Sequence, residues 1–170
     1  MKNIIKNLRN VFIATLFVGA LVACEDKGYD DYDQGAVPTV SMNGEWLINI
    51  NDAASGEVYI THALHKMYEL NGQVWITDRI GSSTTDFTGW YLETPLDVNL
   101  GTLTFSASER LNTADDSNVT ITNGQIFKNA VIAPSGTVTD SIYFKGTFDY
   151  DPETVLEFSG YKRTGFEEDE

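Results

Sequence analysis

Few side chains in this sequence are suited to catalysis or to metal binding. It has one cysteine, Cys24, and its two histidines are His62 and His65. Residues three positions apart on a strand point to opposite faces, so the two histidines cannot share a metal ion unless their segment is helical. No Gly-x-Ser-x-Gly motif, which would present a nucleophilic serine on a strand-to-helix turn, occurs in the sequence. We therefore expect no catalytic residue, no metal ion and no cofactor.

Two acidic stretches offer oxygen atoms that could bind calcium. In residues 31–35 a glycine stands where the EF-hand pattern places its third ligand, and no glutamate closes the loop. Asp115, Asp116 and Asn118 have the composition of an ordinary polar loop between strands. Neither stretch predicts a calcium site.

The residues before Cys24 indicate a different chemistry for its thiol. Lysines and an arginine at positions 2, 6 and 9 precede a small and apolar stretch, residues 11–23, which is the layout of an export signal. The stretch is shorter than the ~20 apolar residues that cross a bilayer as a helix. Leu21-Val22-Ala23-Cys24 resembles the lipobox of bacterial lipoproteins, in which a cysteine is acylated after cleavage of the preceding bond. The resemblance implies that residues 1–23 are a signal peptide and that Cys24 is the lipidation site.

Residues 24–40 connect this cysteine to the remaining sequence. They are rich in aspartate and glycine and poor in aliphatic side chains, which predicts a flexible acidic tether. Acidic residues directly after the cysteine resemble the surface-export signals of Bacteroidetes lipoproteins. This resemblance implies an outer-membrane lipoprotein of the cell envelope, exposed on the outside of the cell.

The charge balance excludes two classes of partner. Eleven basic and twenty-five acidic residues leave a formal net charge of -14. Nucleic-acid binding needs a basic surface, and an anionic membrane would repel this protein. We therefore expect no nucleic-acid partner, and membrane contact through the lipid anchor only.

Beyond the tether, apolar and polar residues alternate in short segments separated by turn signals, with no sustained apolar stripe at helical spacing. The alternation predicts strands over residues 44–50, 58–67, 73–79, 87–92, 96–111 with a bulge at Gly101, 119–128 as a hairpin or a bulged strand, and two more after 136. About eight strands without crossover helices predict an all-β fold for residues 41–166, an antiparallel up-and-down barrel. A β-sandwich is the alternative. Residues 167–170 are expected to form an acidic tail.

The last two predicted strands show the most regular alternation. If residues 151–153 form their loop, Gly146 lies opposite Phe158, and Phe144 lies opposite Gly160. Aromatic rings that cover strand glycines fit a strongly curved sheet, which again favours a barrel.

Two short motifs resemble known barrel families. Gly44-Glu45-Trp46 is similar to the Gly-x-Trp signature of lipocalin-like barrels, in which the tryptophan plugs the closed end. The ending at residues 158–166, Phe-Ser-Gly-Tyr-Lys-Arg-Thr-Gly-Phe, resembles the terminal strand of a small Bacteroidetes lipoprotein family called lipid-binding putative hydrolase.

The lipocalin resemblance also implies a basic side chain over the tryptophan. In that family it comes from the final strand, and the matching positions are Lys162 and Arg163. Alternation from Phe158 places Lys162 inward and Arg163 outward, so an arginine over the ring would need a bulge near Gly160.

The interior of an eight-stranded barrel can be filled by side chains or can hold one small ligand. We expect it to be lined by apolar residues of several strands: Trp46, Ile48, Phe105, Phe144, Phe148 and Phe158. The leading hypothesis is a lipid-anchored envelope protein that binds a small hydrophobic or lipid-like molecule. One alternative is a structural or accessory module of an outer-membrane complex, with a filled core and a protein partner. A second is a hydrolase whose site residues are dispersed in the sequence.

One tripeptide suggests a modification. Asp140-Ser141-Ile142 resembles the Bacteroidetes O-glycosylation motif, which makes Ser141 a candidate acceptor.

Overall fold

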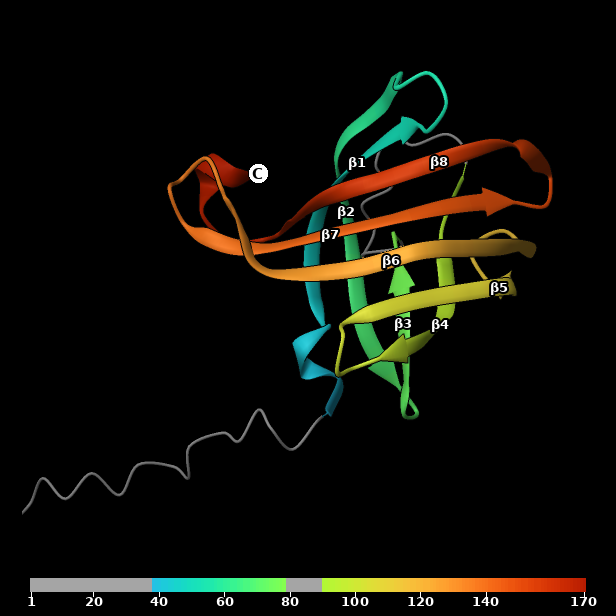
Figure 1. The fold of residues 1–170 in the computed structure, drawn as a ribbon, viewed down its shortest axis with the longest axis horizontal. Helices are drawn as coiled ribbons and strands as arrows, with labels where there is room; N and C mark the ends of the chain where they lie inside the picture. Colours follow the sequence, from blue (N-terminus) through green and yellow to red (C-terminus); the bar gives the residue numbers. More distant parts are fainter. Residues whose placement is uncertain (1–37, 79–89) are drawn as a thin grey trace, which may run out of the picture. The chain divides into compact units, whose positions relative to one another are not determined.

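The computed structural model of the chain describes residues 38–78 and 90–170. Within these ranges eight antiparallel strands pair in chain order, and the last pairs with the first, so that the sheet closes into a barrel (Figure 1). The strands are β1 Gly44–Asp52, β2 Val58–Leu70, β3 Gln73–Thr77, β4 Glu93–Asn99, β5 Thr104–Asn112, β6 Ser117–Ile132, β7 Val138–Phe148 and β8 Asp151–Lys162. Two 3-10 helices, η2 Pro38–Ser41 and η3 Glu167–Asp169, flank them. The predicted barrel is confirmed, and the sandwich alternative is wrong.

Alternation in the sequence corresponds to alternation between interior and surface. In β1, Trp46, Ile48 and Ile50 are completely buried. In β7 every second residue from Asp140 to Phe148 is buried. The inward side chains form one apolar core, to which all eight strands contribute. None of the helices in the described ranges has the length and hydropathy needed to span a membrane.

The predicted strand over residues 96–111 is wrong. The structure has two strands there, β4 and β5, and Asp97 pairs with Ser106 across a hairpin. The side-chain oxygen of Asn99 accepts hydrogen bonds from the backbone N–H groups of Gly101 and Thr102, at 3.0 and 3.2 Å. This side-chain-stabilised turn reverses the chain, and the change of face at Gly101 is therefore a turn rather than a bulge.

The structure also decides two other strand predictions, those for residues 87–92 and 119–128. In the region predicted as strand 87–92, residues 90–92 are not in a strand and residues 87–89 lie outside the described ranges. Of the two alternatives for 119–128, the bulged strand is confirmed, because β6 is continuous and its pairing with β7 shifts between Thr122 and Gln125. Asn123 provides the positive φ of 56° at this bulge.

The register of the last hairpin differs by two residues from the prediction. Phe144 pairs with Phe158, and Ile142 pairs with Gly160. The turn is shorter than predicted, since β7 ends at Phe148 and β8 already begins at Asp151, and the pairing then shifts between Gly146 and Phe148. The turn and this irregularity together produce the difference. The ring of Phe158 still covers Gly146 diagonally, because a Cβ at Gly146 would lie 3.0 Å from its Cε2.

The closure between β1 and β8 requires a glycine. A Cβ at Gly160 would lie 2.0 Å from the carbonyl oxygen of Leu47. Gly160 pairs with Ile48 in the adjoining strand, so the two backbones approach closely where the barrel closes.

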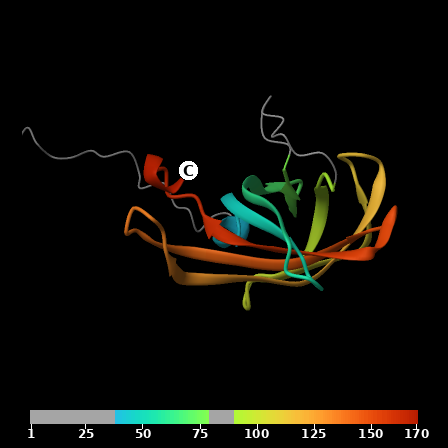
Figure 2. The ribbon, with the colours of Figure 1, turned by 90° about the horizontal axis from the view of Figure 1, so that it is seen from above.

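The last four residues, expected to be an acidic tail, are part of the fold. The carboxylate of Asp169 is buried and accepts hydrogen bonds from the backbone N–H and hydroxyl of Ser135 and from the hydroxyl of Thr164. The hydroxyl of Tyr161 donates to the backbone oxygen of Asp169 at 2.8 Å. These bonds fasten the C-terminal segment to the turn between β6 and β7, and the two lie together in both views (Figure 2).

Candidate functional site

Aromatic rings pack against one another at the centre of the barrel. Phe144 and Phe158 stack face to face, with ring centroids 4.3 Å apart and an interplanar angle of 7°. Phe105 meets Phe144 edge-on at 5.7 Å. The side chains expected to line the interior, Trp46, Ile48, Phe105, Phe144, Phe148 and Phe158, are all buried and belong to a single cluster.

Trp46 lies at one end of this cluster, beneath a basic side chain. The Nζ of Lys162 is 5.8 Å from the centroid of the Trp46 ring, and it donates a hydrogen bond of 3.0 Å to the carbonyl oxygen of Asn43. Burial, followed by the nearby charge of Lys128, lowers the pKa of Lys162. A Cβ at Gly44, whose φ is +147°, would lie 2.5 Å from the Cε of Lys162. The glycine of the Gly-x-Trp motif thus leaves room for the lysine that crosses this end of the barrel.

Arg163, the other basic residue considered for this position, is directed elsewhere. Its guanidinium donates to Glu45 at 2.8 Å and to Glu170 at 2.6 Å. The side chain is about one-third exposed, and these two carboxylates raise its pKa above the ordinary value for arginine. β8 continues without a bulge to Lys162, so Lys162 alone of the two covers Trp46.

Two buried polar atoms beside the aromatic centre have no hydrogen-bond partner among the described residues. They are the indole Nε1 of Trp46 and the imidazole Nε2 of His65. Trp46 and His65 are 0% and 1% exposed, and they are cross-strand partners in β1 and β2. Because leaving such a group unsatisfied costs about 1–3 kcal/mol, this pair requires an explanation.

The environment of His65 determines its protonation. Its Nδ1 lies 3.0 Å from the carbonyl oxygen of Ala63, which can only accept a hydrogen bond, so Nδ1 carries the proton. Burial lowers the pKa of His65 to about 4. At neutral pH the ring is therefore uncharged, and its Nε2 is a free acceptor. Sequence reasoning treated His65 only as a poor metal ligand and missed this role, although its inward parity could have been read from the alternation.

Aromatic residues also lie at the opposite end of the barrel. Tyr59 and Trp90 stack with centroids 5.1 Å apart, and Tyr150 packs near Phe148 at 5.5 Å. The backbone of Trp90 also hydrogen-bonds Tyr150, which joins the two pairs. We call Tyr59, Trp90 and Tyr150 the aromatic rim; the sequence analysis did not identify them, because they lie where the alternation breaks at turns.

Acidic residues surround the aromatic rim. Burial and then the charge of Asp115 raise the pKa of Tyr150 to about 12, and Asp151 and Asp149 act in the same direction. In the described turns at this end, 53–57, 113–116 and 149–150, acidic residues occur and no lysine or arginine does. The field here disfavours the approach of an anionic ligand.

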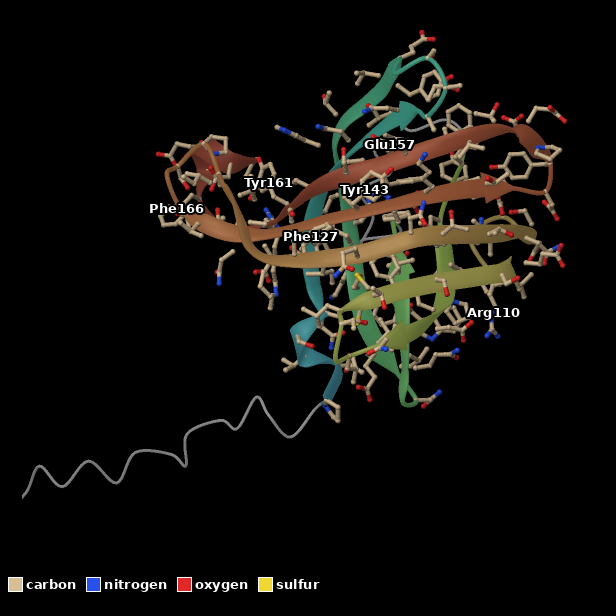
Figure 3. All side chains as sticks on the ribbon, in the orientation of Figure 1. Arg110, Phe127, Tyr143, Glu157, Tyr161 and Phe166 are labelled. Carbon is tan, nitrogen blue, oxygen red and sulfur yellow. The ribbon has the colours of Figure 1, made fainter. Side chains whose placement is uncertain are left out.

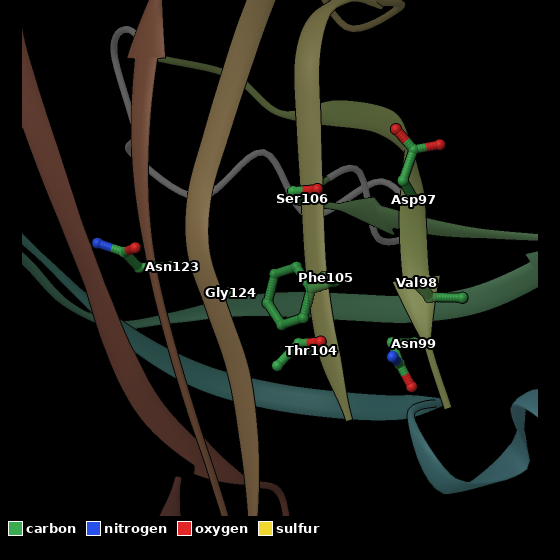
Figure 4. Close-up of a pocket in the computed structure, with 8 residues that line it drawn as sticks. All are labelled: Asp97, Val98, Asn99, Thr104, Phe105, Ser106, Asn123 and Gly124. Atoms are coloured by element: carbon green, nitrogen blue, oxygen red, sulfur yellow. The ribbon is translucent and has the colours of Figure 1, made fainter. Parts of the chain in front are cut away.

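A separate hollow of about 380 Å³ opens to solvent where β4, β5 and β6 meet (Figure 4). Its lining combines two apolar side chains with several polar ones: Asp97, Val98, Asn99, Thr104, Phe105, Ser106, Asn123 and Gly124. Gly124 permits the close contact here, since a Cβ would lie 2.3 Å from the carbonyl oxygen of Phe105. The hollow is too open to solvent to enclose an apolar molecule.

Comparison with known protein families identifies this barrel. The model of the family described as lipid-binding putative hydrolase matches residues 31–167. The chain belongs to this family. The resemblance noted at residues 158–166 is confirmed, and membership in the lipid-binding putative hydrolase family supports lipid binding. No curated protein matches the chain.

The hydrolase part of the family name has no counterpart at His65. This histidine is held by the carbonyl oxygen of Ala63 and by an edge-on contact with Phe158, 6.0 Å between ring centroids. An arrangement in which histidine activates a nucleophile would instead place a serine or cysteine within hydrogen-bond reach of its ring.

The other candidate residues take structural positions. His62 contacts Tyr161 edge-on, and His62 and His65 belong to no cluster of potential metal ligands within the described ranges. Asp115 accepts hydrogen bonds from Asn112 and Ser117 within the β5–β6 turn.

Two residues predicted to be modified complete the set. Ser141 lies half-buried in β7, next to Asp140, which is bound by the Lys128 ammonium at 2.7 Å. Cys24 lies outside the described residues.

Proposed function

We propose that this protein binds a small hydrophobic or lipid-like molecule in its barrel and is held at the cell envelope by acyl chains on Cys24. The observation that carries the binding proposal is the closed barrel with an apolar and aromatic interior, in a chain of a lipid-binding family. An interior of this kind favours apolar guests.

The geometry supports entry at the aromatic rim. Lys162 and Trp46 close one end, with η2 and the buried Met42 adjoining them. At the other end Tyr59 and Tyr150 remain partly exposed, so aromatic side chains meet both solvent and core there. Rings with an apolar body and a polar hydroxyl suit a passage for an amphipathic molecule.

Mass spectrometry of protein purified from its native envelope tests the binding proposal. Protein sprayed under native conditions should carry an added mass that is released on denaturation and extracts into organic solvent. The same mass under native and denaturing conditions, with nothing extractable, from envelope preparations made without delipidating detergent would contradict the binding proposal.

A second candidate function, a module that binds an envelope protein, is favoured by one surface. Ile132 and Val138, cross-strand partners at the end of the β6–β7 hairpin, are 70% and 56% exposed. Phe127 and Phe166 are also exposed towards this end of the hairpin (Figure 3). An accessory role predicts a native complex that Ile132→Ser disrupts and that Val155→Ser, on β8, leaves intact. A monomer of unchanged size in native envelope extracts would contradict it.

A further inference from the structure

The unsatisfied atoms of Trp46 and His65 form a pair with opposite hydrogen-bonding character. The indole Nε1 of Trp46 is always a donor. The Nε2 of His65 is an acceptor, because Nδ1 carries the proton that faces the Ala63 carbonyl. Cross-strand partners on one face have Cβ atoms about 4.5–5.5 Å apart, so the two rings are neighbours on the inner face of the barrel.

The chemistry of this pair selects a hydroxyl group. A hydroxyl oxygen can accept from the Trp46 N–H while its proton is donated to His65. A carboxylate only accepts, and an ammonium only donates, so each would leave one of the two atoms unsatisfied. A charged group would in addition lose its hydration in an apolar interior.

The charged groups around the site also favour an uncharged ligand. A charged group packed against Trp46 is the Lys162 ammonium, from β8, and it donates to the carbonyl oxygen of Asn43. From β2 and β8 the neighbours of His65 are apolar, namely Ala63 and Phe158. The acidic residues around the aromatic rim disfavour an anionic lipid at entry.

We propose that Trp46 and His65 bind the hydroxyl group of a neutral lipid whose apolar part lies against the stacked phenylalanines. This proposal rests on the proposed lipid-binding function and specifies the ligand as a long-chain alcohol or another uncharged lipid with a free hydroxyl. The buried polar pair gives the barrel a preference for this class over hydrocarbons, ethers and fatty-acid anions.

Displacement of an apolar fluorescent dye from the full-length protein tests the preference. The competitors are 1-dodecanol, its methyl ether, which accepts but cannot donate, and dodecanoate. The alcohol should displace the dye from the wild-type protein at least tenfold more effectively than either of the other two competitors. Equal displacement by alcohol and ether would overturn the hydroxyl proposal while leaving lipid binding intact; absence of any dye binding or displacement would overturn the proposed function itself.

Two variants test whether these residues cause the preference for the alcohol. His65→Leu and Trp46→Phe should each still bind the dye, but the alcohol should displace it less than threefold more effectively than the ether. His62→Asn, on the exposed side of the same strand as His65, should keep the wild-type preference. His65→Leu should also raise the unfolding midpoint, because it removes an unsatisfied buried group. An unchanged preference in both variants would overturn the proposal, as would a crystal structure with dodecanol that shows only an ordered water between the two rings.

Discussion

The Nζ of Lys162 lies 5.8 Å from the ring centroid of Trp46, which brings a side chain of the last strand over a side chain of the first. The two residues are also paired in the β1–β8 ladder. This contact covers the end of the barrel at the point where the first and last strands pair. The closing strands are therefore held together by core packing as well as by backbone hydrogen bonds.

Lys162→Ala should destabilise the barrel more than Arg163→Ala. The first change removes a half-buried stem and a cation from the face of Trp46, and we expect a loss of about 1–2 kcal/mol. The second removes ion pairs at the surface, worth up to about 1 kcal/mol. Urea unfolding of the two variants measures the difference, and an equal or reversed order would contradict the assignment of Lys162 to this end.

Gly160→Ala should be strongly destabilising. Its Cβ would collide with the carbonyl oxygen of Leu47, which belongs to the backbone of the neighbouring strand and cannot move without opening the closure. We expect a loss of about 3 kcal/mol or more. Gly101→Ala is the matched control, since its Cβ would meet only the Asn99 side chain at 3.4 Å. A folded Gly160→Ala protein as stable as the control would show that β1 and β8 are not in close contact.

The stability of the protein should fall between pH 7 and pH 5 because of His65. Burial lowers its pKa from 6.5 to about 4 in the folded protein. Between these two values the unfolded chain binds the proton and the folded chain does not, so stability decreases as the pH falls. The expected loss from pH 7 to pH 5 is about 2 kcal/mol.

Urea unfolding of His65→Leu at both pH values checks this assignment, and the variant should lose much less stability than the wild type. His62→Asn should keep the wild-type dependence. Hydrogen bonds from Lys128 and Asn129 lower the pKa of Asp140 against the opposing effect of burial, so its contribution is lost only at more acidic pH. A wild-type dependence in His65→Leu would place the responsible group elsewhere.

Cys24→Ser should abolish the proposed lipid anchoring. Without the thiol the acyl chains cannot be attached, and each methylene buried in the membrane contributes ~0.8 kcal/mol of binding. The variant should be found as unprocessed or soluble protein in a detergent phase separation. Partition into detergent at the wild-type level would contradict the assignment of Cys24.

Much of the barrel could be predicted from local sequence pattern. The inward positions of β1 and β7 follow from period-two alternation, because neighbouring side chains on a strand face opposite sides. The turn at residues 100–103 was missed for a comparable local reason, since a change of parity is produced equally by a bulge and by a hairpin. The pairing of Asp97 with Ser106 and the hydrogen bonds of Asn99 distinguish the two.

Segment by segment, the alternating residues were sufficient to place apolar side chains on one face and to favour a closed barrel over a β-sandwich. The register of β7 with β8 and the pairing of Trp46 with His65 were decided only when the strands assembled, and the absence of a bulge near Gly160 then excluded Arg163 from the Trp46 ring. Each of these depends on contacts between residues distant in the chain, such as the bond between Lys162 and Asn43 across 119 positions. Local alternation specifies which way a side chain points, but the partner it meets is set by turn length and by the close packing of strands across the barrel.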